Sequence, residues 1–148
     1  LAKLRLSNKL PKQLILTPHP GEAATLLNTT VDNVESDRFG AAQKIHKKFN
    51  ATVVLKGAGT IIIHNDGSLR KWGICSSGNP GMATGGMGDA LTGIIAGILA
   101  QGLSIRDAVE AGVDLHAKSA DLMSHEVGEA GLTPTDVIEG LRLLLKYD

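Results

Sequence analysis

A glycine-dense run leads directly into a strongly apolar segment, and no other feature limits the fold of this chain as much. The run spans residues 78–88 and contains Gly78, Gly81, Gly85, Gly86 and Gly88. The residues that follow, 89–100, are apolar at nearly every position, which predicts a helix buried on all sides. Its length of about twelve residues is below the roughly twenty that a membrane-spanning helix needs. The fold must therefore place a glycine-rich loop at the head of a buried helix.

This loop favours a phosphate-binding site. Glycine accepts positive φ angles, so Gly85, Gly86, Met87 and Gly88 can turn successive N–H groups toward one point. The start of a helix adds unpaired N–H donors and the positive end of its dipole. A tight turn that merely requires glycine is the alternative. The run lacks the Gly-Lys-Ser/Thr of a P-loop and the spacing of a dinucleotide-binding G-x-G-x-x-G motif.

Asp89 stands at the end of the glycine run. A carboxylate beside a phosphate site repels the anion unless it takes up a proton or faces a cation, so a general base would have a use there. An acidic residue in the first turn of a helix also complements the helix dipole. The spacing alone does not choose between these two roles.

Strands and helices alternate along the rest of the chain, which predicts an α/β layered fold. In such folds, ligands bind at loops beyond the carboxyl ends of strands. The expected strands are 14–16, 52–55 and a hairpin of 60–63 with 69–72 around a turn at 64–68, and the expected helices are 22–27, 36–49, 89–100, 105–125 and 133–147.

Two strands end in loops that carry polar groups. His19 and Glu22 lie in a segment stiffened by Pro18 and Pro20, which suits fixed hydrogen bonds to a ligand. Residues 56–60, Lys56-Gly57-Ala58-Gly59-Thr60, would let a nucleotide approach the backbone while the lysine meets phosphate charge. A solvated lysine at a strand end is the ordinary alternative.

The composition points to a small-molecule partner. Fifteen basic residues balance fifteen acidic ones and are scattered along the chain, so the field that steers nucleic acid or an anionic membrane is missing. We therefore expect neither a nucleic-acid nor a membrane partner. The only cysteine, Cys75, cannot form an internal disulfide, and a reducing, cytoplasmic location fits best.

Three strings, taken in order, resemble the ADP/ATP-dependent NAD(P)H-hydrate dehydratase family. They are residues 17–22 (TPHPGE), 56–60 (KGAGT) and 79–89 (NPGMATGGMGD), and residues 111–116 (AGVDLH) add to the resemblance. The resemblance implies a three-layer α/β/α ribokinase-like fold, of which residues 1–148 would be the C-terminal portion. It also implies ADP-dependent dehydration of (S)-NAD(P)H hydrate to NAD(P)H, giving AMP and phosphate, a lyase reaction of nicotinamide nucleotide repair.

The resemblance also assigns roles to residues. Asp89 would deprotonate the hydrate and contact the substrate, and His19 would bind the hydrated nicotinamide nucleotide. Lys56, Gly57, Ala58, Gly59, Thr60 and Gly88 would bind the nucleotide, and Gly85, Gly86, Met87 and Gly88 the transferred phosphoryl group. Glu22 would hold Mg²⁺ through water, with ADP, or else ATP, as co-substrate.

Other expectations follow from the same resemblance. The full protein would carry an N-terminal epimerase domain and form a homo-oligomer. The alternatives are a ribokinase-like kinase of a small sugar or vitamin alcohol, and a non-catalytic nucleotide-binding fragment.

Overall fold

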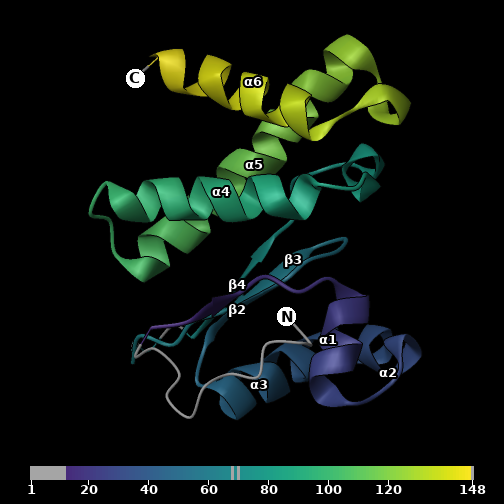
Figure 1. Cartoon of the computed structure of the whole chain (residues 1–148), viewed down its shortest axis with the longest axis vertical. Helices are drawn as coiled ribbons and strands as arrows, with labels where there is room; N and C mark the ends of the chain where they lie inside the picture. The colour runs from purple at the N-terminus through teal and green to yellow at the C-terminus, as the bar shows by residue number, and fades with distance from the viewer. Residues whose placement is uncertain (1–12, 68, 70, 148) are drawn as a thin grey trace. The chain divides into compact units, whose positions relative to one another are not determined.

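The computed structural model describes residues 13–67, 69 and 71–147. The chain forms two compact units, Leu1–Cys75 and Ser76–Asp148. The first unit holds every strand of the described chain, and the second is helical (Figure 1). Each unit is described by itself.

The first unit is built on a sheet of four strands in the order β1-β2-β3-β4. Strand β1 (Ile15–Leu16) runs parallel to β2 (Thr52–Leu55), whereas β3 (Thr60–Ile63) and β4 (Trp72–Cys75) continue the sheet antiparallel. All four residues of β2 are buried, as expected of a β-branched, apolar strand in the middle of a sheet. The bounds of β2 and β3 are those predicted from the sequence.

Three helices, α1 (Pro20–Leu27), α2 (Val31–Ser36) and α3 (Arg38–Phe49), lie on one face of this sheet (Figure 1). The core between helices and sheet is rich in small and β-branched side chains, among them Ala42, Ile45 and Val53, each fully buried. The alternation of buried and exposed residues along α3 is the one that the sequence predicts.

Two predictions for the first unit are wrong in their bounds. The helix expected over 36–49 is divided at Asp37, which ends α2 and caps α3 by accepting a hydrogen bond from the N–H of Gly40 at 2.8 Å. The second hairpin strand, expected over 69–72, begins only at Trp72, which pairs with Ile63. The connection is therefore longer than the predicted turn, and its Ser68 and Arg70 lie outside the described residues.

The second unit contains η1 (Pro80–Ala83), α4 (Met87–Ala100), α5 (Ile105–Val127), η2 (Glu129–Gly131), α6 (Pro134–Leu144) and η3 (Leu145–Tyr147). Ser104 caps α5 and Thr133 caps α6, each through its hydroxyl, as the sequence predicts. A small core joins α4, α5 and α6 around Met87, Ala120 and Val137. This core anchors the start of α4, where the glycine run ends.

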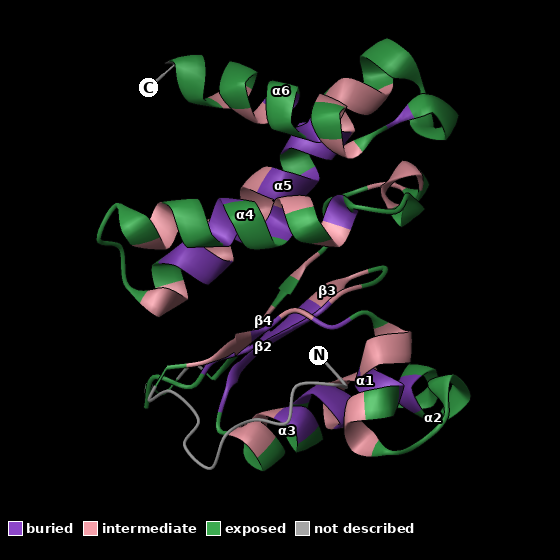
Figure 2. Cartoon of the chain, viewed as in Figure 1, coloured by how far each residue is buried: buried purple, intermediate pink, exposed green. Residues whose placement is uncertain are grey.

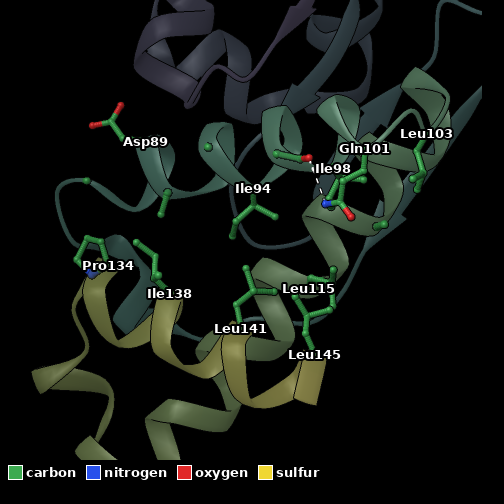
Figure 3. A pocket seen from close by; sticks show the side chains of 15 residues that line it. Asp89, Ile94, Ile98, Gln101, Leu103, Leu115, Pro134, Ile138, Leu141 and Leu145 are labelled. Atoms are coloured by element: carbon green, nitrogen blue, oxygen red, sulfur yellow. Dashed lines mark hydrogen bonds between the residues drawn. The ribbon is translucent and has the colours of Figure 1, made fainter. Parts of the chain in front are cut away.

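The prediction that α4 is buried on all sides is wrong. Its buried side chains are Met87, Leu91, Ile94 and Ile95, while Thr92, Gly93, Ala96 and Gly97 are exposed (Figure 2). Side chains of α4, α5 and α6 form an open, almost entirely apolar groove along this helix (Figure 3). The helix is apolar as predicted, but among the described residues of the second unit nothing covers its second face. No described helix combines the length and hydropathy needed to cross a bilayer.

Candidate active site

The glycine run forms a cradle of backbone at the start of α4. Gly86 takes φ +92°, a value that side-chain-bearing residues rarely adopt, and caps α4 without any side-chain hydrogen bond. In contrast, the other α-helices of the described chain all begin at a side-chain cap. The N–H groups of the first turn of α4, including those of Gly88 and Asp89, lack helical partners because a helix leaves its first donors unpaired. This end of α4 thus keeps its donors and its dipole for an anion.

Asp89 lies in this first turn and is exposed. Its carboxylate points away from Pro134 and Ile138, which line the apolar groove (Figure 3). Asp89 therefore lies at the end of the groove, with its carboxylate directed away from these two apolar side chains. A groove with so few polar groups does not suit a ligand that carries phosphate charge, so the glycine cradle is the better anion site.

Asp121 holds the front of the glycine run in place. From α5 its two carboxylate oxygens accept hydrogen bonds from Gly78 N and Asn79 Nδ2, both at 2.9 Å. Asn79 in turn accepts from Gly81 N at 3.1 Å and caps η1. Asp121 was not predicted from the sequence, because no local spacing marks a contact that spans more than forty residues.

His19 and Glu22 form a capping box at the start of α1. His19 Nδ1 accepts from Gly21 N at 3.0 Å and Glu22 N at 3.3 Å, while Glu22 Oε2 accepts from His19 N at 2.8 Å. Because Nδ1 is an acceptor, neutral His19 carries its proton on Nε2. The His19 side chain is 57% exposed.

Lys56 belongs to the same cluster. Its Nζ lies 3.8 Å from Glu22 Oε2, and Glu22 Oε2 lies 3.6 Å from His19 Nε2. The parallel pairing of β1 and β2 explains this meeting, since both strands present their carboxyl ends at the same edge. The predicted residues His19, Glu22 and Lys56 are therefore brought together in the first unit, and Gly85 to Asp89 in the second.

Comparison with known proteins decides the family. The sequence profile of a family described as NAD(P)H-hydrate dehydratase matches residues 1–142, nearly the whole chain. The chain belongs to the NAD(P)H-hydrate dehydratase family. Its relatives include the bifunctional NAD(P)H-hydrate repair enzyme of Coxiella burnetii, 50% identical over 88% of this chain and 26% of the relative. The ADP-dependent (S)-NAD(P)H-hydrate dehydratase of Neisseria meningitidis is 46% identical over 90% of this chain and 44% of the relative.

Solved structures of this dehydratase family share the fold. The ADP/ATP-dependent NAD(P)H-hydrate dehydratase of Bacillus subtilis, co-crystallised with ATP and Mg²⁺, matches with a TM-score of 0.85 and 31% identity. The match covers 95% of this chain and 50% of that one. A ribokinase-like superfamily protein of Enterococcus faecalis matches with a TM-score of 0.79 and 30% identity, over 99% of this chain and 48% of that one. The predicted ribokinase-like α/β fold is confirmed, and the chain spans half or less of these relatives.

The structure alters the titration of Asp136, at the start of α6. The Thr133 hydroxyl and, secondarily, the Thr133 N–H donate to the Asp136 carboxylate at 2.6 and 2.8 Å, which lowers the pKa of Asp136. This capping box opens α6, and Pro134 beside it would lie 3.0 Å from a Cβ at Gly86. The cap therefore supports the back of the glycine cradle.

We expect this cap to make stability pH-dependent. Because the folded-state pKa of Asp136 is depressed, its contribution is fully present above the ordinary carboxyl pKa and is lost as the pH falls through the lowered value. The measurement is the free energy of unfolding against pH for the wild type and Asp136→Asn. The difference between the two should shrink in acid, and a constant difference would contradict the assignment.

Asp121→Ala should loosen the glycine run. It leaves Gly78 N and the Asn79 amide without their charged acceptor, which costs about 1–3 kcal/mol of unfolding free energy. The control on the same helix is Asp114→Ala. Asp114 only pairs with Lys118 at the surface, at 2.8 Å, so its loss should cost at most about 1 kcal/mol. Chemical denaturation of both variants checks this, and equal losses would show that Asp121 has no special role.

Proposed function

We propose that the protein catalyses the ADP-dependent dehydration of (S)-NAD(P)H hydrate to NAD(P)H, giving AMP and phosphate. The observation that carries the proposal is the uncapped, glycine-rich start of α4 with Asp89 in its first turn, in a chain of the dehydratase family. This arrangement supplies donors for a phosphoryl group and a carboxylate for a proton. Relatives named for the same reaction support it.

The proposed chemistry has two steps. Asp89 takes the proton of the hydrate hydroxyl as its oxygen attacks the β-phosphoryl group of ADP, and the bond to the AMP oxygen breaks. The phosphorylated hydrate then loses phosphate together with a proton from the ring, which restores the double bond of NAD(P)H. During the transfer, the phosphoryl group would be held by the N–H groups of Gly85, Gly86, Met87 and Gly88, which stabilise its negative charge.

We propose that the first unit binds the two nucleotides. The loop of Lys56, Gly57, Ala58, Gly59 and Thr60 would bind ADP. The Nε2–H of His19 would donate to the hydrated nicotinamide nucleotide, since its other ring nitrogen is occupied by the helix cap. Because the helix cap holds the His19 ring in place, its Nε2–H would be a hydrogen-bond donor of fixed direction.

Glu22 would hold Mg²⁺ through an indirect contact. Among the described residues, no three His, Cys, Asp or Glu side chains gather as a metal site. The Glu22 oxygen that faces Lys56 already accepts the His19 N–H. Mg²⁺ keeps several waters and is commonly held by substrate phosphates and one or two carboxylates. We therefore propose that Glu22 holds Mg²⁺ through water, and that the ion neutralises phosphate charge.

Glu22→Gln should separate the cap from the metal role. Glutamine keeps the capping box, so the unfolding free energy should change by no more than about 1 kcal/mol. The neutral side chain should raise the Mg²⁺ concentration that gives half-maximal activity. The control is Asp32→Asn, which changes another acid of the first unit, an exposed one in the first turn of α2. An unchanged Mg²⁺ dependence in Glu22→Gln would remove Glu22 from the metal site.

We extend the proposal to the whole protein. Residues 1–148 would form the C-terminal part of a dehydratase domain in a cytoplasmic homo-oligomer, and an epimerase domain would precede it. The curated relatives named bifunctional support the second domain.

The reaction is tested by the return of reduced-nicotinamide absorbance when hydrated NADH or NADPH is mixed with the protein, Mg²⁺ and either ADP or ATP. Recovery with release of AMP and phosphate from ADP is the expected result. A stable phosphorylated product would instead indicate a kinase of a sugar or vitamin alcohol. Calorimetric binding of ADP without turnover would indicate a nucleotide-binding protein.

A further inference from the structure

Arg38 lies beneath the loop of residues 56–60. It is the first residue of α3, and its guanidinium donates from Nη1 to the carbonyl oxygen of Ala58 and from Nη2 to that of Lys56 at 3.4 Å. Glu35 Oε2 lies 3.9 Å from its Nε. The side chain is only 17% exposed, so the guanidinium is a fixed part of the first unit.

These contacts decide which side of the loop presents its N–H groups. Every peptide bond described is trans, and in a trans peptide the N–H points opposite to the carbonyl. Since the carbonyls of Lys56 and Ala58 point at Arg38, the N–H groups of Gly57 and Gly59 point to the other side. Two donors are thereby turned to the side of the loop opposite Arg38, where successive N–H groups can bind an anion.

The glycine at position 57 is matched to this arginine. Gly57 takes φ +145°, and a Cβ there would lie 2.6 Å from Arg38 Nη2. The loop is closed on its far side by the hydroxyl of Thr60, which donates to Gly57 O at 3.3 Å. Arginine and glycine thus define one loop conformation together, although nineteen positions separate them in the sequence.

We propose that Arg38 is the positioning residue of the nucleotide-binding loop. It binds two alternate carbonyls so that the intervening N–H groups face the phosphates of a nucleoside diphosphate, and its positive charge strengthens the same site from below. Arg38 itself touches no ligand. This inference rests on the proposed function, because it assumes that residues 56–60 bind ADP.

The test compares Arg38→Met with Arg106→Met. Arg106, near the start of α5 in the other unit, is equally buried, at 17% exposure, and pairs with Glu110 at 3.1 Å, so it matches Arg38 in burial and in having a carboxylate partner. Calorimetric ADP titration and steady-state kinetics should show the dissociation constant and KM for ADP raised roughly 10- to 100-fold in Arg38→Met, from the loss of charged hydrogen bonds. The KM for the hydrate should stay near the wild-type value, and Arg106→Met should bind ADP normally.

Two further variants distinguish positioning from general stability. Arg38→Lys keeps the charge but cannot reach both carbonyls, so its ADP affinity should remain reduced. Gly57→Ala should weaken ADP binding less in the Arg38→Met background than alone, because the clash with Nη2 is gone.

The outcomes are distinguishable. If the wild type binds ADP and Arg38→Met binds it equally well, Arg38 does not position the loop. If Arg38→Met and Arg106→Met raise the KM for ADP by the same factor, and both raise the KM for the hydrate by that factor too, Arg38 has only a structural role and the inference is wrong. If the wild type itself does not bind ADP, the proposed function fails, and this inference with it.

Discussion

Asp89→Asn is expected to lower kcat by about 10²- to 10⁴-fold, the range ordinarily contributed by a general base. Asparagine has nearly the same shape but cannot take the proton of the hydrate hydroxyl. If Asp89 only complements the dipole of α4, the change should cost about 0.3–1 kcal/mol of stability and leave activity intact. The absorbance assay with ADP, run beside thermal unfolding, separates the two roles.

The matched control for Asp89 is Asp107→Asn. Asp107 also stands in the first turn of a helix, α5, where its side chain accepts from the Ser104 hydroxyl at 2.7 Å. The control variant should lose some stability and keep full activity. Full activity in Asp89→Asn would refute the base role, and the proton would then have to go to another group.

Gly86→Ala is expected to have the second large effect. The φ of +92° at this position costs a side-chain-bearing residue about 1–3 kcal/mol, and the new Cβ would lie 3.0 Å from Pro134 Cγ. The backbone must shift to relieve both, which turns the N–H groups of Gly88 and Asp89 away from the phosphoryl group. Removing a single preorganised donor of this kind costs about 10²- to 10³-fold in kcat.

Gly93→Ala is the control for Gly86→Ala. It lies in the interior of the same helix, and a Cβ there would meet nothing within 4 Å. Alanine should therefore stabilise the protein by about 0.5–1 kcal/mol, because glycine is unfavourable in a helix interior. Denaturation curves and kcat for both variants check the prediction. If Gly86→Ala keeps its kcat, the cradle does not hold the reacting phosphoryl group.

Local signals in the sequence were sufficient where a short segment carries its own information. The β-branched run of β2, the caps Ser104 and Thr133, and the glycine run before α4 were all predicted, because strand propensity, capping and positive φ are properties of neighbouring residues. The three motifs in order also predicted the family. The missed break at Asp37 arose because helical periodicity continues across a residue that can either join a helix or cap one.

The clusters of the candidate site needed the tertiary structure. His19 and Glu22 cap α1 locally, but their meeting with Lys56 depends on the pairing of β1 with β2. The contacts of Asp121 with Gly78 and Asn79 likewise join residues that only the packing of α5 brings together.

The sequence by itself determined the secondary structure of most segments and the family, and it predicted the residues that we propose to carry the chemistry. Only the tertiary structure decided which side chains support the two loops, that α4 keeps one face uncovered in the described chain, and which way the N–H groups of Gly57 and Gly59 point. The physical reason is one of distance along the chain, because caps, turns and periodicity act over a few residues. The hydrogen bonds of Arg38 and Asp121, in contrast, join residues 18 to 43 positions apart. Such residues meet only when whole helices and strands pack against one another.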